Sequence, residues 1–202
     1  MSPVSFRAAR TYRSPRQGPL DPESAVTRAV SYGLKAACPS AVATAGAALA
    51  RLVPPGSILV PVPSTTRGTC AANHVLCEAI CRAMPRPDRG AVVPAVLSTG
   101  RLPSQAARHR LGHPPHPVAA LPFAADPSVR LGARGGPIIL VDNVRTSGHT
   151  LAAAGRALQT VTDRPLAVVW ADASGTLPSP VPSSPGSWPN GVRISPRESM
   201  VV

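Results

Sequence analysis

The chain of 202 residues contains one lysine, Lys35, and only 3% of its residues are aromatic. So few aromatic rings argue against a surface that stacks the bases of single-stranded nucleic acid. No hydrophobic run approaches about 18 residues, which excludes an ordinary membrane-spanning helix. No apolar signal segment stands at the N-terminus, so we expect the four cysteines to be reduced thiols of a cytoplasmic protein with no membrane partner.

Hydrophobic residues make up 44% of the chain, which is enough to build a core and excludes full disorder. The net charge of +12 favours a polyanionic partner such as nucleic acid or a phosphate-rich ligand. However, all but one of the 21 basic residues are arginine, and alanine and proline are also abundant. A GC-rich coding sequence produces the same bias without selection for binding, so both interpretations of the charge stay open.

The composition divides the chain into three parts. Residues 1–23 are arginine-rich and interrupted by proline, which predicts a flexible basic N-terminus. Residues 24–175 carry the periodic apolar segments of a folded domain. Residues 176–202 are rich in proline and serine, which predicts a flexible tail.

Within the domain, apolar patterns and proline positions predict the helices and strands. Pro39 should break the first helical segment into two helices. An apolar strand, a helix and a second apolar strand follow one another over 138–170, and this βαβ unit predicts a parallel sheet. The expected helices cover 24–52, 69–84 and 151–161, the expected strands cover 57–63, 91–97, 138–141 and 166–170, and a long loop covers 98–130.

The most informative segment is residues 142–150, which we expect to form a polar turn at the carboxyl end of a buried strand. Open α/β sheets bind ligands at such strand ends. Backbone N–H groups and hydroxyls from Thr146 to Thr150 can form an anion site where the next helix begins. Gly148 allows close approach of a phosphate, and Asp142 can accept hydrogen bonds from sugar hydroxyls. This combination favours a sugar phosphate as ligand, whereas an ordinary capped strand-to-helix turn is the alternative.

Residues 138–150 resemble the signature of type I phosphoribosyltransferases, in which an apolar strand leads to two acids and then Thr-(Ser/Thr)-Gly-x-Thr. Weaker similarity to the competence-associated ComF-like branch covers about residues 24–173. The segments that carry this weaker similarity are 58–64, Arg67-Gly68, Asn73-His74, 101–105 with Arg110, and the helix that ends at Lys35.

The resemblance implies a Rossmann-like fold, in which about five parallel strands are flanked by helices and joined by a small N-terminal hood. It also implies a Mg²⁺-dependent enzyme that binds 5-phosphoribosyl-1-pyrophosphate (PRPP). Such an enzyme transfers the phosphoribosyl group to or from a nucleobase-like acceptor, and pyrophosphate is the leaving group. Related enzymes often form homodimers, so a homodimer is one assembly that the resemblance suggests.

Carried over to this chain, the resemblance implies roles for three groups of residues. No protein residue is a dedicated Mg²⁺ ligand, because the substrate carries the metal, although Asp142 is a candidate. The catalytic candidates are Asp142, Asn143 and Arg67; the PRPP and phosphate ligands are Val144, Arg145, Thr146, Ser147, Gly148, His149, Thr150, Ser64, Thr65 and Thr66; the flexible-loop residues are Arg101, Gln105 and Arg110.

The chain departs from the signature at Asn143, which stands where the family has its second acid. This replacement removes a negative charge from the ribose and Mg²⁺ end of the site. A second hypothesis is therefore a catalytically weakened protein of the same fold that binds PRPP or a nucleotide in regulation or DNA uptake. A third hypothesis, which depends only on the net charge, is a basic nucleic-acid-binding protein.

Cys70, His74, Cys77 and Cys81 share one face of the helix predicted over 69–84. A single straight helix cannot surround a zinc ion tetrahedrally. Free cysteine also behaves as a small hydrophobic residue. We therefore expect this seam to pack in the core rather than to bind a metal.

Overall fold

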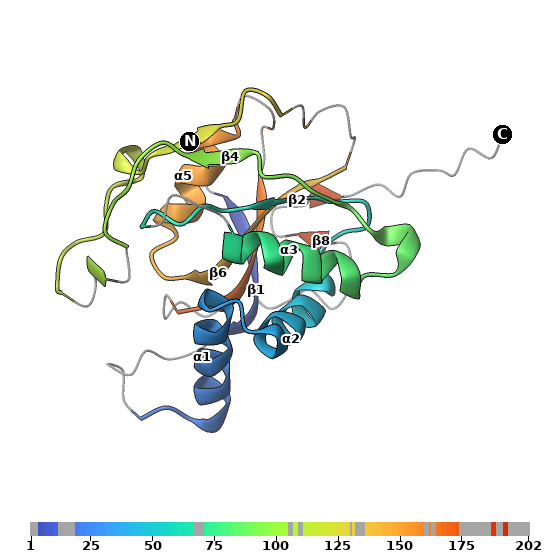
Figure 1. Cartoon of the computed structure of the whole chain (residues 1–202), viewed down its shortest axis with the longest axis horizontal. Helices are drawn as coiled ribbons and strands as arrows, with labels where there is room; N and C mark the ends of the chain where they lie inside the picture. Colours follow the sequence, from blue (N-terminus) through green and yellow to red (C-terminus); the bar gives the residue numbers. More distant parts are fainter. Residues whose placement is uncertain are drawn as a thin grey trace.

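A computed structural model of the chain shows an α/β fold in which helices flank a parallel sheet (Figure 1). This arrangement confirms the predicted α/β class, in which about five parallel strands are flanked by helices. The residues that the structure describes are 4–11, 19–66, 71–104, 107–108, 111–129, 131, 136–159, 162, 165–173, 187–188 and 192–193.

The main sheet has five strands in the order β1-β7-β6-β2-β3, and every neighbouring pair is parallel. Its centre consists of apolar runs in which nearly all residues are buried, as expected for a parallel sheet with both faces covered. The five strands are β1 (Ser5–Thr11), β2 (Ile58–Pro61), β3 (Ala91–Val92), β6 (Ile138–Arg145) and β7 (Leu166–Asp172).

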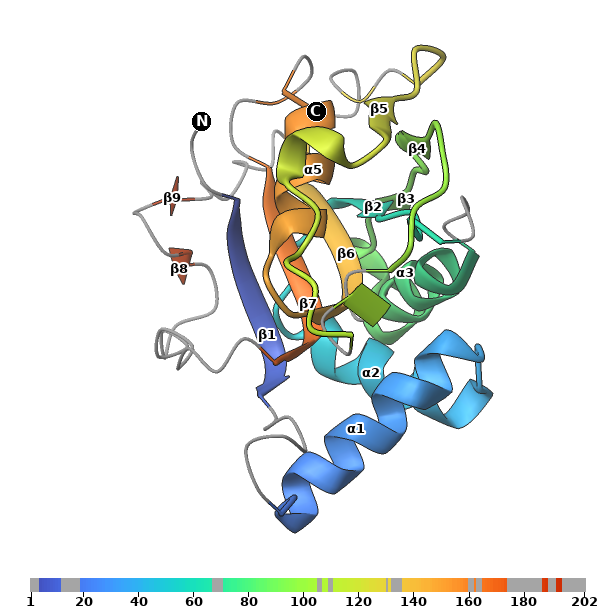
Figure 2. The ribbon, with the colours of Figure 1, turned by 90° about the vertical axis from the view of Figure 1, so that its left-hand side faces the viewer.

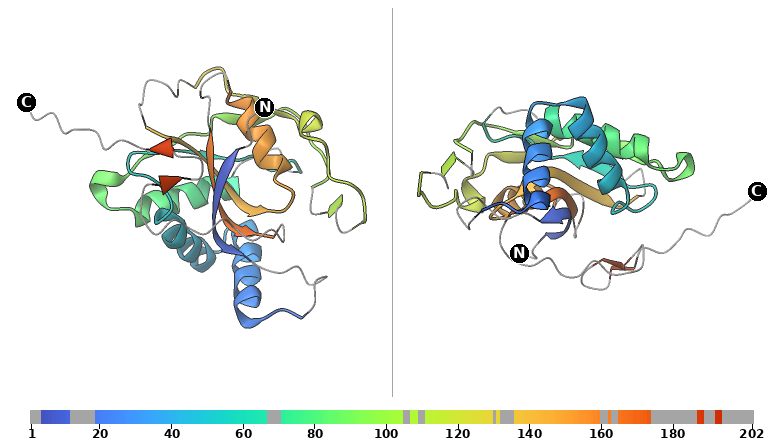
Figure 3. Two further views of the ribbon diagram at one scale, coloured as in Figure 1. Left: turned by 180° about the vertical axis from the view of Figure 1, so that it is seen from behind. Right: turned by 90° about the horizontal axis from the view of Figure 1, so that it is seen from below.

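Four helices cover the two faces of this sheet: α1 (Pro22–Lys35), α2 (Pro39–Ala50), α3 (Ala71–Ala83) and α5 (His149–Ala157). The break between α1 and α2 lies before Pro39, as predicted. Alternate side chains of the strands point to opposite faces. Thus Leu59 and Ile139 pack with α1, α2 and α3, whereas Val60 and Leu140 pack with α5. Views from the side and from behind show α5 across the sheet from α2 and α3 (Figures 2 and 3).

The chain reverses its direction of travel across the sheet between β2 and β6. The β2–α3–β3 unit leads to one edge, whereas the β6–α5–β7 unit leads toward the other. In open parallel sheets, such a switch point leaves a crevice beyond the carboxyl ends of the two central strands. The topology therefore places the ends of β2 and β6 together as the candidate ligand site.

The N-terminal segment is a correction to the sequence analysis, because Ser5–Thr11 form an edge strand where we expected a flexible segment. β1 pairs in parallel with β7 from Ser5↔Leu166 to Thr11↔Asp172. Phe6 and Ala8 pack on the α5 face, and Ala9 packs on the opposite face. The pairing covers the edge of β7, which is buried along its whole length. The arginines in this strand obscured its short apolar pattern.

The region from 91 to 130 also differs from expectation. The single strand predicted over 91–97 is two strands, β3 and β4 (Val96–Ser98), which belong to different sheets. Pro94 lies between them and cannot donate a ladder hydrogen bond, which accounts for the division. The predicted loop 98–130 contains β5 (Phe123–Ala125), which pairs with β4, and the short 3-10 helix η3 (Val118–Ala120). A second 3-10 helix, η2 (Arg86–Asp88), precedes β3.

The remaining differences concern element ends. β6 continues to Arg145, so residues 142–145 are strand and not turn, because β7 still pairs with them up to Arg145↔Asp172. Helix α5 begins at His149, two residues before the expected start. Within 176–202 the structure describes two short antiparallel strands, β8 (Ser187–Trp188) and β9 (Val192–Arg193).

The cysteine seam of α3 is only partly a core seam. Cys77 is fully buried and Cys81 half-buried, whereas His74 forms a half-exposed pair with Glu78 at 3.5 Å. Cys70 lies outside the described residues. The described residues contain no group of three metal-ligating side chains, and no helix among them is long and apolar enough to cross a membrane.

The packing of β1 generates a stability prediction. Phe6→Ser should lower the free energy of unfolding by about 1–3 kcal/mol, because a half-buried ring leaves the α5 face. Arg10→Ser, at an exposed position of the same strand, should change it by less than about 0.5 kcal/mol. Urea denaturation of both variants measures the difference. Equal and negligible effects would show that this segment does not belong to the folded sheet.

Candidate functional site

The central feature of the site is the point at which β2 and β6 separate. The last ladder bond between them runs from the Val62 N–H to the Val141 carbonyl, at 3.0 Å. The next bond of a parallel ladder would join the Asn143 N–H to the Val62 carbonyl. Both of those backbone groups bind side chains instead, so the strands open at this position.

The side chains of Asn73 and Asp142 span the opening through a series of hydrogen bonds, which we call the relay. The Asn73 Nδ2 amide, from the first turn of α3, donates to the Val62 carbonyl at 2.7 Å and to Asp142 Oδ1 at 3.1 Å. The Asn143 N–H also donates to Asp142 Oδ1, at 2.8 Å. Oδ1 thus accepts two hydrogen bonds, whereas Oδ2 accepts none from the part of the chain that the structure describes. One carboxylate oxygen is held by protein, and the other accepts no hydrogen bond within the described residues.

The charge of Asp142 is held at an energetic cost. Burial raises the pKa of Asp142 from 3.8 to about 6, although hydrogen bonds from Asn143 and Asn73 and the positive charge of Lys35 lower it in part. The carboxylate is therefore about nine-tenths ionised at pH 7. A cation or hydroxyl group that approaches Oδ2 would relieve this penalty.

Asn143 faces α1 rather than open space. Its Nδ2 amide donates to the Ser31 carbonyl of α1 at 3.1 Å, across 112 residues of sequence. Its buried Oδ1 has no hydrogen-bond partner among the described residues. Near it, the Trp170 indole N–H donates to the Thr27 carbonyl at 3.1 Å. These two bonds hold α1 at the carboxyl end of the sheet, and Figure 2 shows β1 ending beside this helix.

The turn after β6 has the form of an anion site. Gly148 is the N-cap of α5 and adopts a left-handed backbone with φ of +77°. The first N–H groups of a helix have no partners within it, and the helix dipole favours an anion there. Ser147 is exposed and Thr146 and Thr150 are half-buried, so their hydroxyls border the same turn. Val144, a predicted phosphate ligand, instead packs against the core on the α1–α3 face.

Arg145, another predicted phosphate ligand, lies next to the turn and contacts Asp172 and Phe6. Its Nη1 donates to both carboxylate oxygens of Asp172, at 3.0 and 3.2 Å, and Asp172 is only 2% exposed. Its guanidinium also stacks on the Phe6 ring, 4.1 Å from the centroid. A Cβ added to Gly148 would lie 3.2 Å from Arg145 Nε. Arg145 thus links Phe6, near the start of β1, to Asp172, the last residue of β7.

His149 is fixed by the segment that precedes η3. Its Nδ1 lies 2.8 Å from the His116 carbonyl, and because a carbonyl only accepts, Nδ1 carries the proton. Arg156, on the same helix, donates to the Val118 carbonyl at 3.0 Å. These two contacts fasten residues 116–118 to α5, beside the anion turn.

The loop after β2 lies against the predicted flexible loop. The Leu102 N–H donates to the Thr65 carbonyl at 2.8 Å, which brings Arg101 beside Ser64, Thr65 and Thr66. Thr65 is buried, Ser64 half-buried, and Thr66 and Arg101 exposed. Three further predicted residues, Arg67, Gln105 and Arg110, lie outside the described part of the chain.

The donor set bears on how Mg²⁺ could bind here. Asp142 Oδ2 is a hard oxygen ligand of the kind that Mg²⁺ prefers, whereas Asn143 Oδ1 is buried on a side chain that binds α1. One such oxygen does not make a protein cage. It fits only a metal ion that is held mainly by substrate oxygens and water.

Two features of the site were not assigned from the sequence. The role of Asn73 depends on α3 packing against both β2 and β6, which no local pattern shows. The Arg145–Asp172 pair joins residues 27 positions apart at the ends of neighbouring strands. Correct alignment of β6 with β7 could have found the second pair, because both residues end their strands.

The chain matches no protein-family model, and it has no significant match among curated proteins. The similarity of residues 138–150 to the type I phosphoribosyltransferase signature therefore stays a prediction.

The raised pKa of Asp142 predicts a pH-dependent gain of stability on neutralisation. A carboxyl whose folded-state pKa is raised stabilises the fold at low pH, and this contribution is lost as pH rises from about 4 through about 6. Asp142→Asn removes the penalty. It should therefore raise the free energy of unfolding by about 1–3 kcal/mol at pH 8 and leave it unchanged at pH 4. Urea denaturation at the two pH values measures this, and equal effects at both would contradict it.

Proposed function

We propose that the chain is a ComF-like type I phosphoribosyltransferase that binds PRPP beyond the carboxyl ends of β2 and β6. In this proposal, phosphoribosyl passes to or from a nucleobase-like acceptor with Mg²⁺ present. Helix α1 serves as the hood over the site. The observation that carries the proposal is the pairing of a half-free carboxylate, Asp142, with an anion turn at residues 146–149 on one strand at the switch point.

Each part of PRPP has a counterpart in the site. Asp142 Oδ2 would accept hydrogen bonds from the ribose hydroxyls, because Oδ1 is already engaged. The N–H groups at the start of α5 would hold the 5′-phosphate. The pyrophosphate would then face the Ser64–Thr66 loop and Arg101, which the Thr65–Leu102 hydrogen bond brings together.

Catalysis of this kind needs little covalent chemistry from the protein. As pyrophosphate leaves, positive charge develops on the ribose, and the negative charge of Asp142 stabilises it. When bound, Mg²⁺ supplies positive charge to the leaving pyrophosphate. Arg101 adds charge on the same side, and the loop that carries it excludes water when it closes over the substrate.

A second candidate function is PRPP or nucleotide binding without efficient transfer, and the contact of Asn143 favours it. The family's second acid is replaced here by an amide that is committed to the Ser31 carbonyl. Asn143→Asp would remove that donor and set a carboxylate against a carbonyl, so it should loosen α1 as well as add charge. Release of pyrophosphate from PRPP, assayed with a panel of nucleobases, separates an enzyme from a binding module.

The first test of the proposal is calorimetric titration of PRPP with Mg²⁺. The wild-type chain should bind, and Asp142→Ala should lower the affinity at least tenfold, because the ribose hydroxyls lose their acceptor. Asp126→Ala is the matched control, since among the described residues its carboxylate binds only the neighbouring Ser128. Failure of the wild-type chain to bind would overturn the proposal.

The anion turn gives a second test. Gly148→Val should weaken PRPP binding at least tenfold, because the side chain strains a backbone with φ of +77° and crowds Arg145 at the turn. Gly56→Val is a matched control: Gly56 has φ of +66° with open space around it, and it precedes β2 at the strand end away from the site. Equal affinities for the two variants would show that phosphate does not bind at Gly148.

A further inference from the structure

We propose that Asn73 is the positioning residue that sets the orientation of the Asp142 carboxylate for ribose recognition. This inference rests on the proposed function and assigns a role to a residue outside the signature segment. Asn73 lies in the third position of α3, whereas Asp142 lies on β6, 69 residues further along the chain.

The geometry uses the full donor capacity of the Asn73 amide. An asparagine Nδ2 carries two N–H donors. One is directed to the Val62 carbonyl at 2.7 Å and the other to Asp142 Oδ1 at 3.1 Å. The shorter bond anchors the amide to the end of β2, so the longer bond holds the carboxylate from a fixed point.

This arrangement determines which carboxylate oxygen a ligand meets. Asp142 Oδ1 lies between the Asn73 amide and the Asn143 N–H, so rotation about the Cβ–Cγ bond would break both hydrogen bonds. Oδ2 is then the oxygen directed to the ligand. Without Asn73, the Val62 carbonyl and Asp142 Oδ1 would share a partly buried opening as two acceptors with no donor between them.

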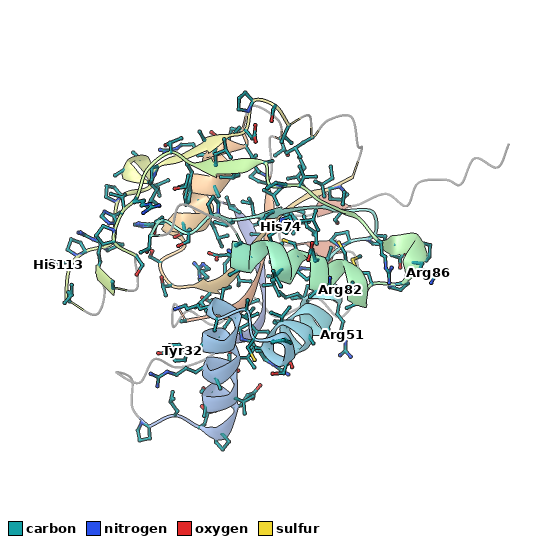
Figure 4. The ribbon with its side chains drawn as sticks, viewed as in Figure 1. Tyr32, Arg51, His74, Arg82, Arg86 and His113 are labelled. Atoms are coloured by element: carbon teal, nitrogen blue, oxygen red, sulfur yellow. The ribbon has the colours of Figure 1, made fainter. Side chains whose placement is uncertain are left out.

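The assignment to Asn73 is specific within its helix. The adjacent His74, labelled on α3 in Figure 4, pairs with Glu78 one turn along the helix, at 3.5 Å. Within the described part of the chain, it makes no hydrogen bond to Val62 or Asp142. Glu78 also lies 3.7 Å from Arg82, on the exposed side of the helix. A change at Glu78 therefore tests the helix surface without touching the opening between β2 and β6.

The experiment compares two probes, inorganic phosphate and ribose 5-phosphate, by calorimetry without metal. Both should occupy the anion turn, but only ribose 5-phosphate presents hydroxyls to Asp142. Asn73→Ala and Asn73→Leu, which keeps the branched shape of the side chain but has no donor, should each weaken ribose 5-phosphate binding about tenfold, as expected for loss of a positioned hydrogen bond. Binding of inorganic phosphate should stay unchanged in both variants, and Glu78→Ala should leave both affinities unchanged.

The outcomes separate the possible failures. A wild-type chain that binds ribose 5-phosphate no more tightly than phosphate overturns the proposed function and this inference with it. A normal wild-type preference that survives in both Asn73 variants overturns the inference alone. Equal loss for both probes shows a general structural role and also overturns it. If Asn73→Ala lowers the unfolding temperature steeply, Asn73→Leu, which keeps the approximate volume of the side chain, provides the comparison.

Discussion

The separation of β2 and β6 beyond Val62 is the constraint on which the rest of the site depends. A continued ladder would close the switch point with backbone hydrogen bonds and leave no room for a ligand. Here the Val62 carbonyl and the Asn143 N–H are satisfied by the side chains of Asn73 and Asp142 instead. The opening therefore leaves neither of these two backbone groups without a hydrogen-bond partner. It also places a carboxylate oxygen where the proposed substrate would lie.

Two carboxylates at the carboxyl end of the sheet, Asp172 and Asp142, have opposite electrostatic environments. Asp172 is 2% exposed and is matched by Arg145, so its charge is compensated within the protein. Asp142 receives hydrogen bonds but only the distant charge of Lys35, so its pKa is raised to about 6. Asp142, the carboxylate without a paired positive charge, is the one whose charge a bound ligand would offset. Such a site sacrifices stability for binding, which is common where function needs a charge in a partly buried position.

Support for the anion turn comes from parts of the chain that are far apart in sequence. Phe6, on the edge strand β1, lies under the Arg145 guanidinium, which in turn lies against Gly148. On the other side of the turn, His149 and Arg156 hold residues 116–118 against α5. Helix α1 is held over the strand ends by the bonds of Asn143 to Ser31 and Trp170 to Thr27. The site is therefore formed by the ends of three strands and by two packed segments that no single motif contains.

The sequence by itself determined the elements whose signals are local. The apolar runs of β2, β6 and β7, the break at Pro39, and Gly148 at the start of α5 follow from burial, ring geometry and the left-handed backbone, each within a few residues. Only the tertiary structure decided that Ser5–Thr11 form an edge strand, that Arg145 binds Asp172, and that Asn73 donates a hydrogen bond to Asp142. These features depend on strand order and register, which bring residues 27, 69 and 161 positions apart into contact and leave no periodic pattern along the chain.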